Sequence, residues 1–307
     1  MEAMKTLKPN IQIPVDLTNP GQFFACCGLL ELAVRLWPGA EGSPGAFGWF
    51  EPKHFCILTA DRTKKLDELL AATANLKTWV NGELDDTLQE GDDDETEESE
   101  KEPPFQPFTL KWNEGKEAIF LDWWTDKSIK PWAGSMKDRT ILRAMLAAIN
   151  AASSSPFDDL KAVFDPLKTL KPTIDGKKPR RQTPKKREPF YFDPRRGNKS
   201  HPLDSGFSPD THKMQAECCP ALEALCFIGL QRARPASTGV ANQSCYTVWP
   251  KLSENNPGVS ANLVGAVTCG LIRFPGSSNY VFNNYFRTDQ RKHKTFSQAK
   301  LERSHHD

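Results

Sequence analysis

Apolar and polar residues alternate from Ile11 to Leu17, which is the pattern of a strand with one buried face. The next residues, Thr18-Asn19-Pro20, combine N-cap residues with a proline at the first helical position, so they predict the start of a helix. We expect this helix to extend to about Trp37. Its residues 23–30 are apolar on nearly every side, so the first half of the helix should be buried.

The same patterns predict a mixture of strands and helices along the rest of the chain. The expected strands are Trp49–Leu58, a hairpin of Phe108–Trp112 with Ala118–Trp124, a short aromatic strand at Phe190–Phe192, and Ser244–Trp249, Leu263–Phe274 and Tyr280–Phe286. The expected helices are Thr63–Lys77, Ser135–Ala152, Asp158–Leu170 and Pro209–Arg232. Strands and helices do not alternate as in a doubly wound sheet. We therefore predict an α+β fold with a mixed or antiparallel sheet, packed helices and long charged insert loops.

Two charged segments of opposite sign interrupt these elements. Glu83–Glu102 holds twelve acids and one lysine, a net charge of −11, whereas Lys168–Lys199 holds twelve Lys or Arg and three acids, a net charge of +9. We interpret the acidic segment as a solvated linker, because carboxylates in a flexible run lack the fixed geometry of a cation site. Prolines at 172, 179, 184 and 189 predict that the basic segment is an extended loop.

The charged segments also suggest how the chain is organised. We distinguish an N-terminal α/β part (1–82), the acidic linker (83–104), a Trp-rich hairpin with helices (105–170), the basic loop (171–188) and a C-terminal α/β part (189–307). Since 38% of the 307 residues are apolar, the chain can bury a large core. We interpret the parts as one continuous globular domain with two inserts, and expect the charged tail 287–307 to fray.

The basic segment favours contact with nucleic acid. Extended Lys/Arg-rich chains attract phosphates without reading sequence, and the neighbouring aromatic residues Phe190–Phe192 could stack on bases. The candidate contact residues here are Lys177, Lys178, Arg180, Arg181, Lys185, Lys186, Arg187, Arg195, Arg196, Asn198 and Lys199. Asn198 lies in a glycine-bearing turn from which it could read the edge of a groove. A solvated surface loop without a partner is the alternative interpretation.

Three other regions add candidate nucleic-acid contacts. In the segment LDWWTDKSIKPWAGSMKDRT we expect Trp123 and Trp124 in the core, but Trp132 at the surface with Lys127 and Lys130. The amides of Asn242 and Gln243, in a loop after Gly239, are further candidates for reading bases. A second phosphate-binding patch would comprise Arg287, Arg291, Lys292, His293 and Lys294.

No catalytic residue, metal site or cofactor is predicted. The chain has no G-x-x-x-x-G-K-[ST] loop, no G-x-S-x-G elbow and no H-E-x-x-H helix. The eight cysteines lie mostly in apolar runs and favour reduced thiols in the core. The adjacent pairs Cys26-Cys27 and Cys218-Cys219 would point about 100° apart on a helix, unlike a C-x-x-C zinc motif. Without a membrane-length apolar stretch or a signal peptide, we expect a cytoplasmic protein and no membrane partner.

Several phrases of the sequence resemble one known family. They are VDLTNPGQFFACCGLLELAVRLWPGA, LDWWTDKSIKPWAG, FYFDPRRGNKSHPLDSGFSPD, ALCFIGLQRARP and YFRTDQRKHKTF. Over about Val15 to Phe296 the chain resembles the compact large-subunit-type proteins of type I-G CRISPR-Cas effector complexes, formerly called type I-U. None of these phrases is a catalytic signature.

The resemblance implies a non-catalytic subunit of an RNA-guided surveillance complex in antiviral defence. Its partners would be guide RNA, target DNA, other subunits of the complex and a helicase-nuclease recruited on target binding. In such complexes base pairing reads the sequence, while protein recognises the short motif beside the target and the backbone. Two alternatives remain open. One is an assembly subunit that binds partner proteins but not target DNA; the other is a metal-dependent nucleic-acid hydrolase, supported only by scattered Asp and His residues.

Overall fold

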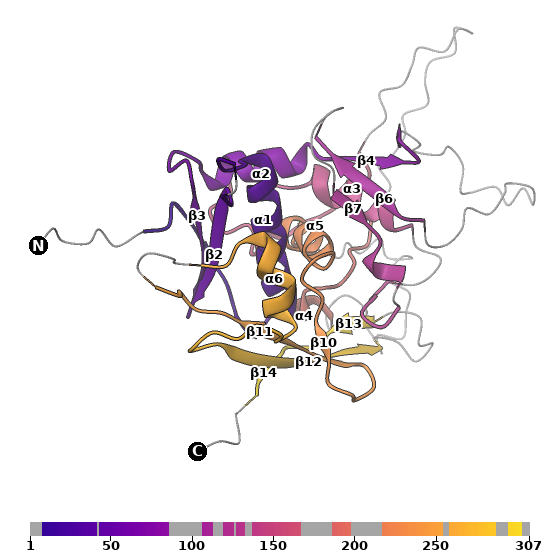
Figure 1. The fold of residues 1–307 in the computed structure, drawn as a ribbon. Coiled ribbons are helices and arrows are strands. Elements are labelled where there is room, and N and C mark those ends of the chain that lie inside the picture. Colours follow the sequence, from indigo (N-terminus) through magenta and orange to yellow (C-terminus); the bar gives the residue numbers. More distant parts are fainter. Residues whose placement is uncertain are drawn as a thin grey trace, which may run out of the picture.

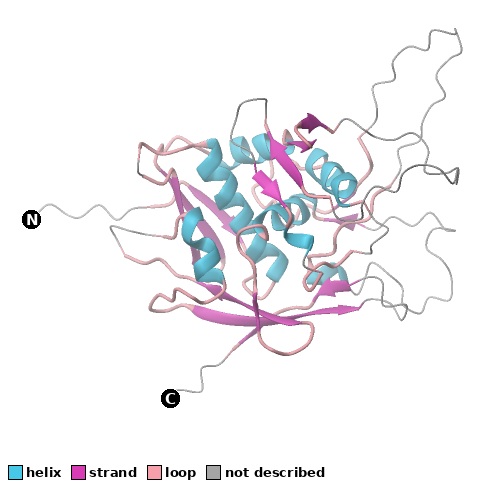
Figure 2. Ribbon diagram, turned by 45° about the vertical axis from the view of Figure 1, so that its right-hand side comes forward, coloured by secondary structure: helices cyan, strands magenta, loops and turns pink. Residues whose placement is uncertain are grey.

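Two central helices, α1 (Pro20–Leu36) and α5 (Pro220–Gly229), are surrounded by antiparallel sheets in the computed structural model (Figure 1). The structure describes residues 8–41, 43–85, 106–112, 119–125, 127–132, 137–166, 186–197, 217–253, 258–286 and 294–302. Figure 2 shows the helices in the middle of these residues and the long strands at the outside. This combination confirms the predicted α+β class.

The helices α1 and α5 cross at a glycine on each. A Cβ atom added to Gly28 would lie 2.1 Å from the carbonyl oxygen of Leu225, and one added to Gly229 would lie 2.0 Å from that of Phe24. Both positions are inside van der Waals contact, so any larger side chain would force the two backbones apart. Because the helices touch so closely, α1 is buried continuously from Pro20 to Ala33, as predicted for its first half.

The start of α1 has the local signals that predicted it. The side chain of Asn19 accepts a hydrogen bond from the backbone N–H of Gln22 at 3.1 Å, and Pro20 occupies the first turn. Near its other end, Arg35 and Glu31 form an ion pair with 2.7 Å between Nη2 and Oε1. The helix ends one residue before the predicted Trp37.

The first sheet packs beside α1 and has the strand order β1-β3-β2. Its strands are β1 (Ile11–Pro14), β2 (Ala46–Glu51) and β3 (His54–Thr59). The predicted single strand over Trp49–Leu58 is wrong, because a turn at Pro52-Lys53 divides it into the β2–β3 hairpin. Both strands are largely buried, so the apolar run shows no break in its period. Helix α2 (Leu66–Ala74) lies within the predicted Thr63–Lys77.

The second sheet contains the predicted hairpin and two strands that the sequence did not indicate. Its order is β5 (Glu83–Leu84), β4 (Lys77–Val80), β6 (Phe108–Lys111) and β7 (Ile119–Leu121). The linker interpretation is therefore wrong for its first residues. Glu83 and Leu84 pair with β4, and the carboxylate of Asp85 lies 3.3 Å from Arg139. Residues 86–105 lie outside the described part of the chain.

The middle of the chain follows the predictions only in part. A short 3₁₀ helix, η1 (Trp123–Thr125), and helix α3 (Asp138–Ala147) follow the hairpin, and α3 lies inside the predicted Ser135–Ala152. The helix predicted over Asp158–Leu170 is wrong for its described residues. Instead, β8 (Lys161–Ala162) pairs with β9 (Glu217–Cys218), a strand distant in sequence. Pro166, which disfavours a helical residue before it, was the signal against that helix.

A second segment predicted to be helical is also shorter than expected. The helix predicted over Pro209–Arg232 is formed only as α5, which begins at Pro220, because β9 precedes it. The residues 209–216 lie outside the described part of the chain. Upstream, α4 (Pro194–Gly197) is a single turn.

The third sheet is built from the C-terminal residues. Its strands are β10 (Ala236–Ser237), β11 (Gln243–Val248), β12 (Ser278–Phe286), β13 (Lys294–Phe296) and β14 (Lys300–Leu301). The predicted strands Ser244–Trp249 and Tyr280–Phe286 correspond to β11 and β12. The prediction of a frayed tail is wrong for residues 294–302, because β13 and β14 both pair with β12.

One apolar segment that was predicted to be a strand forms a helix instead. The strand predicted over Leu263–Phe274 is wrong, since helix α6 (Ala261–Thr268) and a turn occupy this segment. A short apolar run does not distinguish a buried strand from a buried helix. The contacts of α6 with α1, β2 and β11 select the helix.

A single cluster of buried side chains extends from Ile11 to Ala299 and joins elements of the three larger sheets. The division into parts and inserts stays a prediction. Among the described residues, no helix combines the length and the apolar character needed to cross a lipid bilayer.

Candidate nucleic-acid interface

Most of the aromatic residues considered as contacts form part of the core. Trp132, Phe190 and Phe192 make an aromatic cluster with Trp123, Trp124 and Phe227. Trp123 and Trp124 are buried as predicted, and the indole N–H of Trp123 donates to the carbonyl of Phe227 at 2.8 Å. The surface position predicted for Trp132 is wrong, because only 3% of this residue is exposed. Its ring lies 4.8 Å from that of Phe190, centre to centre.

The aromatic residues beside the basic segment are also unavailable to bases. Phe190, Tyr191 and Phe192 are buried and form no strand, contrary to the prediction. Tyr191 has a φ angle of 68°, outside the β region, so the backbone does not continue as a strand here. The rings of Phe190 and Phe192 lie 5.4 Å apart, centre to centre, in the aromatic cluster. The side chains that sequence reasoning assigned to stacking instead hold the core together.

Lys130 is buried with Trp132, so its predicted role as a surface phosphate contact is wrong. Its ammonium nitrogen lies 4.9 Å from the centre of the Trp132 ring, and 7% of the residue is exposed. Burial lowers the pKa of Lys130, while the nearby carboxylate of Asp138 opposes this shift. Burial likewise raises the pKa of Asp138 to about 6, although Arg139 and Lys130 favour its charged form.

Arg195 is held by acids of its own chain. Its guanidinium bonds both carboxylate oxygens of the buried Asp193, and it also donates to Asp158 at 2.6 Å and to the carbonyl of Phe157 at 2.6 Å. Burial alone would lower the pKa of Arg195, but the hydrogen bonds and charges of Asp193 and Asp158 outweigh it and raise the pKa. The side chain of Arg195 is still 41% exposed, so its contact with nucleic acid stays a prediction. Arg196, on the same turn, is half-buried.

The two described cations of the basic loop (171–188), Lys186 and Arg187, also have acidic partners. Lys186 lies 3.2 Å from Glu188, and Arg187 lies 2.5 Å from Asp165. These pairs neutralise part of the charge expected to bind phosphates. The predicted contacts outside the described part of the chain are Lys177, Lys178, Arg180, Arg181, Lys185, Asn198, Lys199, Arg287, Arg291, Lys292 and His293.

The remaining candidates converge on one surface. Asn242 and Gln243 lie on the β10–β11 hairpin, Lys127 lies in the loop after η1, and Lys294 begins β13. The amine of Lys294 donates to Oδ1 of Asn242 at 3.2 Å, and its backbone N–H donates to the carbonyl of Pro131 at 2.7 Å. Lys294 thus links Asn242 of the hairpin to the 127–132 segment, which contains Lys127.

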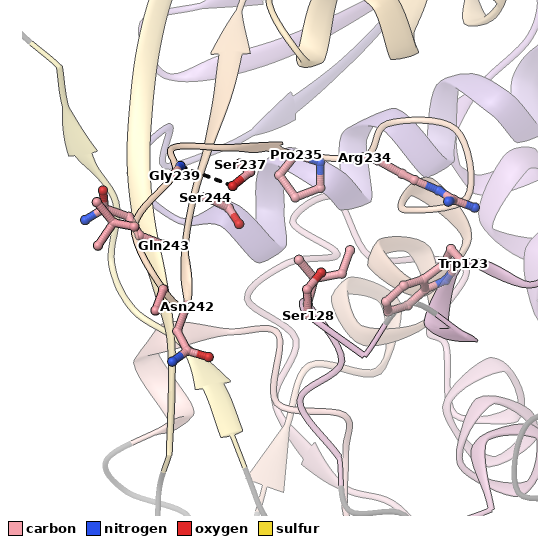
Figure 3. Close-up of a pocket in the computed structure, with 12 residues that line it drawn as sticks. Trp123, Ser128, Arg234, Pro235, Ser237, Gly239, Asn242, Gln243 and Ser244 are labelled. Carbon is pink, nitrogen blue, oxygen red and sulfur yellow. Dashed lines mark hydrogen bonds between the residues drawn. The ribbon is translucent and has the colours of Figure 1, made fainter.

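A pocket of about 460 Å³ opens on this surface. Figure 3 shows the hairpin with Asn242, Gln243 and Ser244 on one side, and Ser128 and Trp123 on the other. We call it the hairpin pocket. It is lined by Trp123, Ser128, Ile129, Arg234, Pro235, Ser237, Gly239, Val240, Ala241, Asn242, Gln243 and Ser244.

Asn284 of β12 connects the two sides of the hairpin pocket. Its amide nitrogen donates to the carbonyl of Ser128 at 3.0 Å, and its backbone N–H donates to the carbonyl of Asn242 at 2.8 Å. Asn242 has a φ angle of 57°, in the left-handed region, and Gly239 has one of 82°. The hairpin tip is therefore fixed by tertiary hydrogen bonds in a conformation that few residues adopt.

One cationic residue, Arg234, lines the pocket, and Lys127 directly precedes the wall residue Ser128. Lys127 is exposed next to Ser128, and 49% of the Arg234 side chain is exposed while it pairs with Asp122 at 3.3 Å. Gln243 is less available, because its amide accepts from Thr238 at 2.9 Å and donates to Asn283 at 3.4 Å. Sequence reasoning missed Arg234 and the serines 128, 237 and 244. The phrase ARPASTGVANQS, rich in small and polar residues, was the signal for this loop.

Some reactive groups elsewhere among the described residues are enclosed. Glu223 is fully buried, and burial followed by the charge of Asp193 raises the pKa of Glu223 to about 8. Burial also raises the pKa of the thiols of Cys26 and Cys218, which disfavours the nucleophilic thiolate. The described residues contain no group of three or more His, Cys, Asp or Glu that could hold a metal ion.

Comparison with protein families, curated proteins and solved structures finds no match for this chain.

Proposed function

We propose that this chain is a non-catalytic, nucleic-acid-contacting subunit of an RNA-guided CRISPR-Cas surveillance complex of type I-G, acting in the prokaryotic cytoplasm. The phrases that resemble this family support the assignment. The first of them supplies the cap of α1 and the glycine that contacts α5, and the fourth supplies the facing helix. These phrases therefore encode the centre of the fold rather than isolated surface motifs.

The observation that carries the nucleic-acid role is the contact of Lys294 with Asn242 at the hairpin pocket, together with the exposed Lys127, which directly precedes the wall residue Ser128. Cations provide sequence-independent attraction to phosphates, and amides can hydrogen-bond to base edges. The net charge of +9 over Lys168–Lys199 adds to the attraction. Guide RNA pairing would read the target, while this protein contacts backbone and the target-adjacent motif.

The direct test is binding of the purified full chain to duplex DNA, single-stranded DNA and structured RNA at several salt concentrations. If about six cations contact duplex phosphates, the logarithm of the affinity should fall with the logarithm of salt at a slope near −5. Replacing Lys177, Lys178 and Arg180 with glutamine should make the slope shallower by roughly 2 to 3. Glutamine at Lys53, Lys64 and Lys65, beside the first sheet, is the matched control and should leave the slope unchanged. A salt-independent affinity in the unmodified chain would reject the proposal.

A second candidate is an assembly subunit that contacts partner proteins instead of target DNA. It is favoured by exposed apolar side chains on α6 and the turn after it, where Leu263 is 44% and Leu271 is 83% exposed. Under this alternative, substituting Lys177, Lys178 and Arg180 should prevent co-purification of the complex. Under the first proposal the complex should assemble and fail to bind target DNA. Lys186 and Arg187 are less suitable for this test, because their substitution would also break ion pairs with Glu188 and Asp165.

A further inference from the structure

The hairpin pocket has the size and the chemistry of a nucleotide site. Resting on the proposed contact with nucleic acid, we infer that it takes a single unstacked nucleotide of an unpaired strand, with the base inside and its phosphates at the cationic rim. Its volume of about 460 Å³ lies within the range, roughly 300–1,000 Å³, of pockets that hold small organic groups.

The walls of the pocket match the surface of a nucleobase. Ile129 and Pro235 offer apolar contact for the faces of a flat ring. Ser237 and Ser244 are cross-strand partners, so their side chains lie on one face of the hairpin, opposite Ser128 in Figure 3. Hydroxyl groups both donate and accept, so they can satisfy either kind of polar group on a base edge.

Asn242 adds a positioned donor at the mouth of the pocket. Its carbonyl accepts from Asn284, and its Oδ1 accepts from Lys294. These bonds leave the NH₂ group, which donates to no residue in the described part of the chain. The hydrogen bond from Lys294 to Oδ1 holds the amide in place before a ligand arrives. Such a group suits a carbonyl oxygen of a base.

The rim favours an anionic ligand. Lys127 is exposed beside the pocket, and the ion pair of Arg234 with Asp122 is also exposed, so that phosphate can replace the carboxylate at little expense. Paired bases are stacked inside a duplex and could enter only by leaving it, which makes an unpaired strand the natural ligand. An extended peptide without acidic residues would lack the charge that this rim attracts.

The test compares two 12-nucleotide strands of the same charge, one of thymidines and one of abasic sites, with a uridine strand as the RNA arm. The full chain should bind the base-bearing strands at least about five-fold more tightly than the abasic strand. Ser244→Leu places a larger side chain in the pocket. It should lower the affinity for thymidine strands to the abasic level and leave abasic binding unchanged. Ser278→Val, at the other end of the β11–β12 ladder, is the matched control.

The outcomes separate this inference from the proposed function. If the chain binds all strands equally, or if Ser244→Leu keeps the preference for bases, the pocket is not a base site although nucleic-acid contact stands. If no strand binds, the proposed function fails and the base site fails with it. If Ser244→Leu only prevents co-purification with other subunits, the pocket is a protein contact and the inference is overturned. Thermal melts of both variants identify a folding defect. If Ser244→Leu has such a defect, Ser244→Ala replaces it in the test. This variant should retain the fold and lose part of the preference for base-bearing strands.

Discussion

The aromatic cluster and the hairpin pocket are adjacent and share Trp123, yet polar and basic residues are buried in the first and exposed at the second. In the aromatic cluster, Trp132 and Lys130 are enclosed with Phe190 and Phe227. At the hairpin pocket, Lys127 and Asn242 stay exposed. Lys127 and Lys130 are three residues apart in the same loop. A sequence segment rich in basic and aromatic residues can therefore contribute side chains both to the core and to the surface. Which of the two a residue joins depends on what packs against it.

The largest expected effect comes from removing an aromatic ring of the cluster. Trp132→Ala should lower the free energy of unfolding by about 3–5 kcal/mol, because it leaves a large cavity between Phe190 and Phe227. Denaturant unfolding measures this loss, with Trp132→Phe as a milder control. If Trp132→Ala kept full stability and lost nucleic-acid affinity instead, the ring would belong to the surface and the comparison would be wrong.

The next effect concerns the buried carboxyl of Glu223, which accepts hydrogen bonds from the backbone N–H groups of Phe192 and Asp193. The folded chain keeps the proton of Glu223 up to pH about 8, whereas an unfolded chain releases it near its ordinary pKa of 4.5. The contribution of Glu223 to the free energy of unfolding should therefore be largest below pH 4.5. It should be lost progressively as the pH rises to 8.

Glu223→Gln removes this titration and keeps a carbonyl oxygen for one of the two N–H groups, while its NH₂ group replaces the oxygen that accepts from the other. The variant should be more stable than the unmodified chain at pH 8 by about 1–3 kcal/mol, and similar to it near pH 4.5. Unfolding curves across this pH range give the measurement. A smaller dependence up to pH 6 should persist in the variant because of Asp138, whose pKa is raised to about 6. Parallel pH profiles for the two proteins would contradict the prediction.

The smallest effect distinguishes two neighbouring lysines by their exposure. Lys127→Ala should weaken nucleic-acid binding a few-fold and make the salt slope shallower by about 1, as for one lost phosphate contact. Lys130→Met replaces a buried ammonium by an apolar chain of similar length and should leave the slope unchanged. Salt titrations of both variants decide the matter. Equal slopes in the two variants would show that exposure does not select the contact.

Local signals in the sequence determined a good part of the fold. Asn19-Pro20 marked the start of α1, and alternation marked β1 and the β6–β7 hairpin. These elements follow from backbone geometry and from the periods of helix and strand, which act within a few residues. The fold class could be read from their order. The sequence also indicated the charged segments and the burial of Trp123. It named Lys127, Asn242 and Lys294 as candidate contact residues.

Only the tertiary structure decided which of these residues meet and which are buried. The 261–268 segment became a helix because of its contacts with α1 and β11, and Phe190–Phe192 entered the core although its pattern suited a surface strand. Lys294 and Asn242 meet because β13 and β11 both pair with β12. Their contact joins residues 52 positions apart in the sequence. Burial and proximity depend on distant partners, so no local pattern contains them.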